Sequence, residues 1–226
     1  MRLFAALLPP DDVLAELADA VAALRLTADD ARLRWTERVN WHITLAFYGE
    51  VAEDRLPGLR ERLARTAGRG RPLRLRVAGG GRFGDRALWA GLTGGAEEDG
   101  EPADELRRLA ASCAAAGRHT GLGTAEARHF RAHVTLARVR GRSRDSGSAP
   151  GPLPGAATAP GAGALPAGAP RAGAVDLRPY AAALDGFRSE PWTAGELALV
   201  RSTLPGSGVP GEQPRYAQVA AWALGG

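Results

Sequence analysis

A short pattern of histidine, any residue, threonine, leucine and alanine occurs twice in the chain, at residues 42–46 and again at 133–137. In an extended strand successive side chains point to opposite faces, so the histidine and threonine of each copy share one face. The apolar residues share the other face, which suits a core. The repeat therefore predicts two similar strands that together build one site from two halves.

A pair of histidines fits in-line chemistry at a phosphodiester. One neutral imidazole takes a proton from the attacking oxygen, and one imidazolium gives a proton to the leaving oxygen. The other two histidines, His119 and His129, have no such repeat, and we interpret them as structural residues.

Metal binding is the alternative for this region, because His129 and His133 have the i, i+4 spacing that brings two imidazoles together on a helix. The Val-Thr-Leu that follows His133 favours a strand instead. We therefore expect no metal and no cofactor.

Hydrophobic periodicity predicts alternating strands and helices over most of the chain. Strands are expected at residues 3–8, 33–35, 41–48, 73–77, 87–92, 132–139, 197–202 and 215–224, and helices at about 13–26, 53–66, 102–116 and 177–184. The glycine-rich residues 79–84 are followed by another strand and not by the helix that a phosphate-binding loop needs, so a connecting turn is expected there. Residues 141–174 consist mainly of Gly, Ala, Pro and Ser, a composition typical of a flexible linker or loop.

Charge and cysteine content restrict the environment and the ligand. The net charge is +4 and all 29 basic residues are arginine, whose planar guanidinium pairs well with phosphate. The arginines are dispersed along the sequence, which does not favour a long nucleic-acid-binding groove.

The single cysteine, Cys113, excludes an internal disulfide and lies among small residues, so we expect a packing role and a cytoplasmic setting. No segment has the features of a signal peptide or of a membrane span.

Further stretches accompany the two motifs, at residues 1–6, 41–51, 87–92, 130–138 and 199–202. With them the sequence resembles the 2H phosphoesterase superfamily, most closely its RNA 2',3'-cyclic phosphodiesterase branch, also called 2'-5' RNA ligase. The resemblance covers nearly the whole chain except residues 141–174, which look like an insertion. It implies a single α+β domain over residues 1–226, bilobed, with two antiparallel sheets and outer helices related by a pseudo-twofold axis and a cleft between the lobes.

The resemblance also implies a role for each motif residue in the hydrolysis of a 2',3'-cyclic phosphate at an RNA end. His42 would give a proton to the leaving 3'-oxygen and His133 would accept one from water, leaving a 2'-phosphate. Thr44 and Thr135 would donate hydrogen bonds to the non-bridging oxygens as charge develops. Because the two motifs are nearly symmetric, the sequence does not fix which histidine is the acid.

Two arginines are candidates for phosphate binding. Arg131 shares the parity of His133, and Arg138 lies further along the same strand; either could instead be a solvated charge at the rim. The expected partners are RNA ends or small cyclic-phosphate nucleotides, with no membrane, no obligate protein partner and a monomeric chain. The sequence leaves open reversible 2'-5' ligation at the same site and a non-catalytic role in binding RNA ends.

Overall fold

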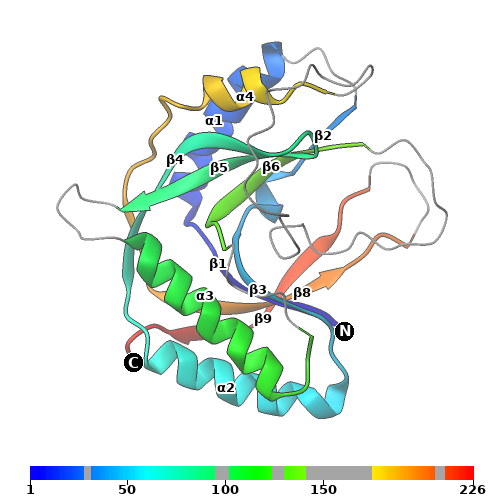
Figure 1. Cartoon of the computed structure of the whole chain (residues 1–226), viewed down its shortest axis with the longest axis vertical. Coiled ribbons are helices and arrows are strands. Elements are labelled where there is room, and N and C mark those ends of the chain that lie inside the picture. Colours follow the sequence, from blue (N-terminus) through cyan, green and yellow to red (C-terminus); the bar gives the residue numbers. More distant parts are fainter. Residues whose placement is uncertain (28–31, 95–101, 124–129, 141–174, 207–211) are drawn as a thin grey trace, which may run out of the picture.

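The structure is a computed structural model, and it describes residues 1–27, 32–94, 102–123, 130–140, 175–206 and 212–226 (Figure 1). The linker expected at 141–174 and His129 lie outside these residues. The strands are β1 (Arg2–Leu7), β2 (Leu33–Trp35), β3 (Ile43–Glu50), β4 (Leu73–Phe83), β5 (Ala87–Gly94), β6 (His133–Val139), β7 (Trp192–Ala194), β8 (Glu196–Thr203) and β9 (Arg215–Ala223). The helices are α1 (Asp11–Thr27), α2 (Leu56–Gly68), α3 (Pro102–His119) and α4 (Arg178–Ala183), with short 3-10 turns at Arg38–Asn40 and Glu53–Arg55.

The strands form one antiparallel sheet that consists of two halves. The order is β7-β4-β5-β6-β3-β1-β8-β9, with β2 paired to β6. β6 and β3 are the inner strands of the two halves and pair at a single position, Ile43 with Val134. Figure 1 shows α1 and α4 beside the half that contains β4 to β6, and α2 and α3 beside the half that contains β1, β3, β8 and β9. The expected α+β fold with antiparallel strands and outer helices is confirmed, and the two expected sheets are joined into one.

The helices bury their apolar faces against the sheet because their leucines and alanines recur at helical spacing. In α2 the buried residues are Leu59, Leu63 and Ala67, each four positions after the last. α3 buries Cys113, and burial raises the pKa of this thiol to about 12, which fits the packing role expected for it. The Tyr48 hydroxyl donates a hydrogen bond of 3.1 Å to the Cys113 carbonyl and so ties β3 to α3.

The glycine-rich turn expected at 79–84 was wrong, because β4 continues through Gly79, Gly80 and Gly81 to Phe83. Gly79 has a φ of +66° and lies at a register shift between β4 and β5, the position where a bulge favours glycine. A Cβ on Gly81 would lie 2.1 Å from the ring of Trp89. Glycine is therefore needed here for close packing within a strand, and the turn follows at Gly84.

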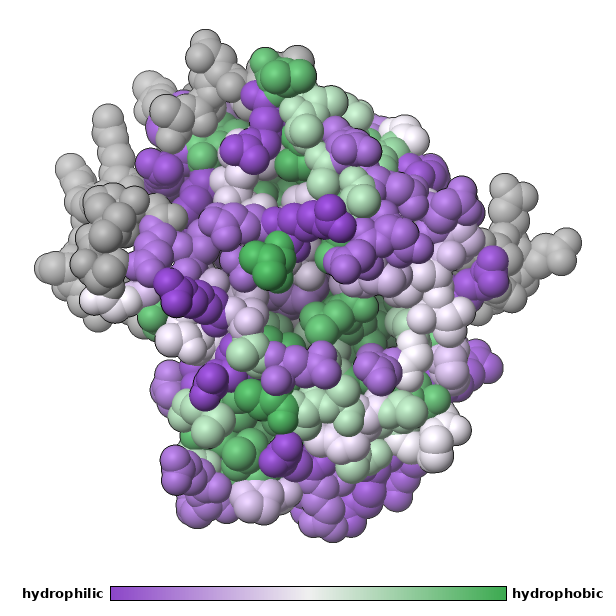
Figure 2. Space-filling model, turned by 180° about the vertical axis from the view of Figure 1, so that it is seen from behind, coloured by the Kyte–Doolittle hydropathy of each residue, from purple (hydrophilic) through white to green (hydrophobic). Residues whose placement is uncertain are grey.

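None of the helices among the described residues is long and apolar enough to cross a bilayer. On the face seen from behind, hydrophobic residues lie in small groups separated by hydrophilic ones (Figure 2). The short strand β7, at the edge of the sheet beside β4, was not expected from the sequence.

Candidate functional site

The two motif strands are neighbours in the sheet, and their polar faces coincide. Ile43 and Val134, the pair that joins β3 to β6, are both fully buried. The residues on either side of this pair project to the opposite face. That face therefore carries His42 with Thr44 from one strand and His133 with Thr135 from the other, all four partly buried. The structure brings together the four residues that the repeat predicts.

His42 is oriented by the backbone just before it. Its Nδ1 lies 2.8 Å from the carbonyl oxygen of Asn40, the last residue of a 3-10 turn. A carbonyl only accepts hydrogen bonds, so Nδ1 carries the hydrogen when the ring is neutral and Nε2 remains free for the reaction. The buried Asn40 side chain donates a bond of 3.4 Å to Gln213, which in turn donates a bond of 2.8 Å to the Trp35 carbonyl. The segment before β9 thus supports the turn that positions His42.

His133 is oriented in the same way. Its Nδ1 lies 2.7 Å from the carbonyl oxygen of Arg131, again two residues earlier. Nε2 is again left free by this bond. Both imidazoles therefore present the same nitrogen to whatever lies over this face of the sheet.

Aromatic rings pack against each imidazole. His42 has the Phe4 ring at 4.7 Å and the Tyr216 ring at 5.1 Å, the latter edge-on. His133 has Phe83 at 4.9 Å, also edge-on, and Trp89 at 6.1 Å. Sequence reasoning did not select these four aromatic residues. They lie on four other strands, and only the strand order, which the sequence pattern does not reveal, brings them to the histidines.

Burial dominates the electrostatics of both histidines. It lowers the pKa of His42 to about 4, with smaller contributions from the charges of His133 and Arg138, while the bond to Asn40 acts in the opposite direction. The pKa of His133 is also lowered, first by burial and then by the charges of Arg138 and Arg131. The charge of His133 is among the causes that lower the pKa of His42, so the two rings lie near each other. Both rings are neutral in the free protein at pH 7.

Arg138 reaches this site because β6 contains a bulge. Thr135 pairs with Trp89 and Ala137 with the next residue, Leu88, so β6 has one extra residue at this point. Strict alternation would place Arg138 on the face opposite to His133 and Thr135. The bulge moves Arg138 to the face of these two residues. Burial lowers the pKa of Arg138, while the neighbouring Tyr216 hydroxyl acts in the opposite direction.

Arg131 lies at the outer edge of the same site. Its guanidinium carbon is 5.2 Å from the centre of the Trp89 ring, a cation–π contact, and its side chain is exposed. The third histidine of the described chain, His119, is exposed at the end of α3 and outside this site.

The assembled group has two imidazoles with free Nε2 atoms, two hydroxyls and a partly buried guanidinium on one face. Such a set can hold an anion, donate hydrogen bonds to its oxygens and move two protons. Among the described residues, no group of three or more His, Cys, Asp or Glu side chains lies close enough together to hold a metal ion.

Comparisons with known proteins show the family and the fold of this chain. A family model described as LigT-like phosphoesterase matches residues 7–89. An RNA 2',3'-cyclic phosphodiesterase of Archaeoglobus fulgidus is 33% identical over 144 residues, 62% of this chain and 73% of the relative. One of Aeropyrum pernix is 35% identical over 133 residues, 57% of this chain and 66% of the relative. The chain thus spans about two thirds of the length of these two relatives, and 57% of one from Aquifex aeolicus.

Solved structures share the fold over the full length. The crystal structure of TT0787 of Thermus thermophilus has a TM-score of 0.63 and 27% identity, with 100% of this chain and 99% of that chain covered. A crystal structure of E. coli LigT complexed with 3'-AMP has a TM-score of 0.59 and 20% identity, with 99% and 96% covered.

Proposed function

This chain belongs to the LigT-like phosphoesterases of the 2H superfamily, and we propose that it hydrolyses the 2',3'-cyclic phosphate at an RNA end to a 2'-phosphate. The observation that carries the proposal is the placement of His42 and His133 on one face of adjacent strands, each with Nδ1 bound to a backbone carbonyl. The names of the curated relatives supply the substrate class.

The reaction needs one proton removed and one proton delivered. A water oxygen attacks phosphorus while its proton passes to Nε2 of His133, so a P–O bond forms. The bond from phosphorus to the 3'-oxygen breaks, and that oxygen takes a proton from Nε2 of His42. Water is consumed, and the product has a 3'-hydroxyl and a 2'-phosphate. Two groups on opposite sides of the phosphate match the geometry of in-line displacement.

The charges around His133 support its role as the proton acceptor, whereas the role of His42 depends on the bound phosphate. Arg131 and Arg138 both disfavour a charged His133, which suits a proton acceptor. His42 must be charged to donate, although burial keeps its pKa at about 4 in the free protein. The role of donor therefore requires that the bound phosphate, an opposite charge beside the ring, raise the pKa of His42.

The hydroxyls and Arg138 have the complementary task. Thr44 and Thr135 donate hydrogen bonds to the non-bridging oxygens, and Arg138 pairs with the same oxygens through its planar guanidinium. These donors stabilise the charge that builds up during displacement. No step requires a metal ion, so we expect a chelator to leave activity intact.

The test uses a short RNA with a 2',3'-cyclic phosphate end. We expect a product heavier by one water that, after digestion, co-elutes with a 2'-nucleotide standard and not with a 3'-nucleotide standard. Adding an RNA with a 5'-hydroxyl distinguishes the alternative, because ligation joins the two chains without the gain of water. Recovery of unchanged cyclic phosphate, or of the 3'-phosphate, would contradict the proposal.

A further inference from the structure

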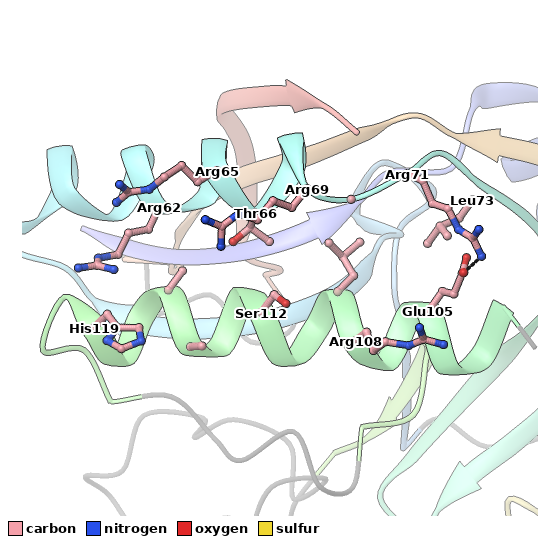
Figure 3. A pocket seen from close by; sticks show the side chains of 14 residues that line it. Arg62, Arg65, Thr66, Arg69, Arg71, Leu73, Glu105, Arg108, Ser112 and His119 are labelled. Carbon is pink, nitrogen blue, oxygen red and sulfur yellow. Dashed lines mark ion pairs between the residues drawn. The ribbon is translucent and has the colours of Figure 1, made fainter. Parts of the chain in front are cut away.

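A second basic region lies away from the histidines, in the groove between α2 and α3 (Figure 3). The cavity has a volume of about 700 Å³. Its lining contains the arginines Arg62, Arg65, Arg69, Arg71 and Arg108. Four of these arginines lie within residues 62–71, and the packing of α3 against α2 adds Arg108 from the opposite wall.

Within the described residues, much of this charge has no counter-ion. Arg71 pairs with Glu105, the acidic residue in the lining, and Arg65 pairs with Glu61 at 3.3 Å. Arg62, Arg69 and Arg108 form no ion pair with any described residue. Unpaired cations on both walls of a groove repel one another and attract an anion.

The spacing of the arginines suits an anion that repeats. Arg62, Arg65 and Arg69 follow one another at intervals of three and four residues, so each lies about one helical turn, about 5 Å, beyond the last. Figure 3 shows this row along α2, with Ser112 and Arg108 on α3 across the groove. A row of guanidinium groups matches successive phosphates of a strand better than one isolated phosphate.

The residues that line the groove also determine how a nucleic-acid strand would bind. Among the described residues, the lining contains no Phe, Tyr or Trp on which a base could stack; its single aromatic ring is the imidazole of His119. Contacts would therefore be made mainly to the backbone, which carries no sequence information. The other long helix near the surface, α1, has the opposite character, with Asp11, Asp12, Glu16 and Asp19 against Arg25 alone. A polyanion is thus directed to one side of the molecule.

The groove and His42 lie on opposite faces of the same half of the sheet. The buried side chains of α2 and α3 belong to the main core, whereas Phe4, which contacts His42, belongs to a separate cluster with Ala6, Ala198 and Val200. One phosphate cannot occupy both places. A strand whose end lies at the histidines reaches the groove only after passing the edge of the sheet.

We infer that the groove between α2 and α3 binds the phosphodiester backbone of the RNA whose end is opened at the histidines. This inference rests on the proposed function for the identity of the ligand. It makes the groove an anchoring site for the body of the RNA, separate from the reaction itself.

The test compares two variants of the full chain with the same loss of charge. The groove variant carries Arg62→Gln, Arg69→Gln and Arg108→Gln. The control variant carries Arg74→Gln, Arg118→Gln and Arg201→Gln, three exposed arginines that do not line the groove. Binding of a fluorescent single-stranded RNA of about 20 nucleotides with hydroxyl ends is measured by anisotropy over a range of salt concentrations.

The groove variant should bind this RNA at least about 10-fold more weakly at low salt. Its slope of log affinity against log salt should become shallower by about 2, the value for three lost phosphate contacts on a single strand. The control variant should resemble the wild type. Single-stranded DNA of equal length should behave as the RNA does, because the groove contacts mainly the backbone.

A second measurement separates this inference from the proposed function. Hydrolysis of a dinucleotide with a 2',3'-cyclic phosphate should be equal in the wild type and the groove variant, whereas KM for the long RNA should rise in the groove variant. A wild type that leaves the dinucleotide intact refutes the proposed function but does not affect the binding experiment with hydroxyl ends. Equal RNA binding by the two variants would overturn the inference. So would displacement of the RNA by polyglutamate as effectively as by unlabelled RNA of equal length, which would indicate an acidic protein partner.

Discussion

The surroundings of His42 and His133 are alike in backbone and different in charge. Each imidazole is bound through Nδ1 to the carbonyl two residues earlier, at 2.8 Å and 2.7 Å. Each also has one edge-on aromatic ring, Tyr216 or Phe83. The same local device is thus used twice, and it fixes orientation without deciding which ring gives the proton.

The difference lies in what surrounds the repeat. The rings beside His42 come from β1 and β9, which are far apart in sequence, whereas those beside His133 come from the single β4–β5 hairpin. Two arginines act on His133, and one of them acts on His42. Distinct roles for two nearly identical motifs therefore depend on residues outside the motifs.

The largest expected effects come from removing either imidazole. His42→Ala and His133→Ala should each lower kcat/KM by about 10²- to 10⁴-fold, the usual contribution of a general acid or base. His119→Ala, which removes an exposed histidine outside the site, is the matched control and should retain full activity. Steady-state kinetics with a dinucleotide cyclic phosphate measures all three. Full turnover by either alanine variant at the site would remove the basis for a two-histidine reaction.

The two arginines should differ in importance. Arg138→Gln should cost about 10- to 100-fold in kcat/KM, because it removes a partly buried guanidinium from the phosphate. Arg131→Gln should cost less than about 10-fold, since this side chain is exposed and contacts Trp89. The same kinetic measurement applies. A larger loss for Arg131 than for Arg138 would place the phosphate on the Trp89 side of His133.

Substitution of Thr44 and Thr135 tests whether the two halves of the site contribute equally to catalysis. Thr44→Val and Thr135→Val preserve shape and remove one donor each, so each should lower kcat about 10-fold, about 1.5 kcal/mol. Thr193→Val, an exposed change in β7, is the control for loss of a threonine elsewhere. Unequal effects at the two motif positions would show that one half holds the transition state more tightly. No effect at either position would exclude the hydroxyls from the reaction.

A titration distinguishes the donor from the acceptor. NMR of the histidine ring protons should give a pKa for His42 of about 4 in the free protein. Addition of a 2'-nucleotide, the expected product, should raise the pKa of His42 by at least about one unit, because the phosphate stabilises the charged ring. The pKa of His133 should rise less, since two arginines remain beside it. The reverse order of the two increases would exchange the assigned roles.

The last expected effect concerns stability in acid and not activity. The folded pKa of His42 lies below the unfolded value of about 6.5, so the unfolded chain binds this proton more readily. The contribution of His42 to the free energy of unfolding should therefore be greatest above pH 6.5. It should decrease as the pH falls toward 4, by at most about 3 kcal/mol. His42→Gln should make this decrease smaller. Urea denaturation of both proteins at neutral and acidic pH measures the difference; equal acid sensitivity would contradict the burial of His42 as its cause.

Local patterns were sufficient for most of the strands and helices and for the motif pair. Alternation around His42 and His133 predicts the faces on which their side chains lie, because that rule depends only on neighbouring residues. Two features escaped this reasoning for physical reasons. The bulge that turns Arg138 toward the site depends on how β6 pairs with β5. The strand through Gly79 to Gly81 depends on the close approach of the Trp89 ring to Gly81, which leaves no room for a Cβ.

The sequence also did not predict which distant segments come together in the fold. Tyr216 reaches His42 because β9 lies beside β8, and β8 lies beside β1, which is a property of sheet order. The arginines of residues 62–71 and Arg108 likewise line one groove only after α2 and α3 pack. The arginines are visible in the sequence, but the groove that they line depends on how the two helices pack.

The single pairing of Ile43 with Val134 has a mechanical consequence. This pair would be the pivot of any rotation between the two halves of the sheet. A histidine directly precedes each of its two residues. Displacement in a rotation grows with distance from the pivot, so opening the two halves would move the outer strands β7 and β9 far more than it moves the imidazoles. Such an opening would leave the distance between the two proton-transfer groups nearly unchanged.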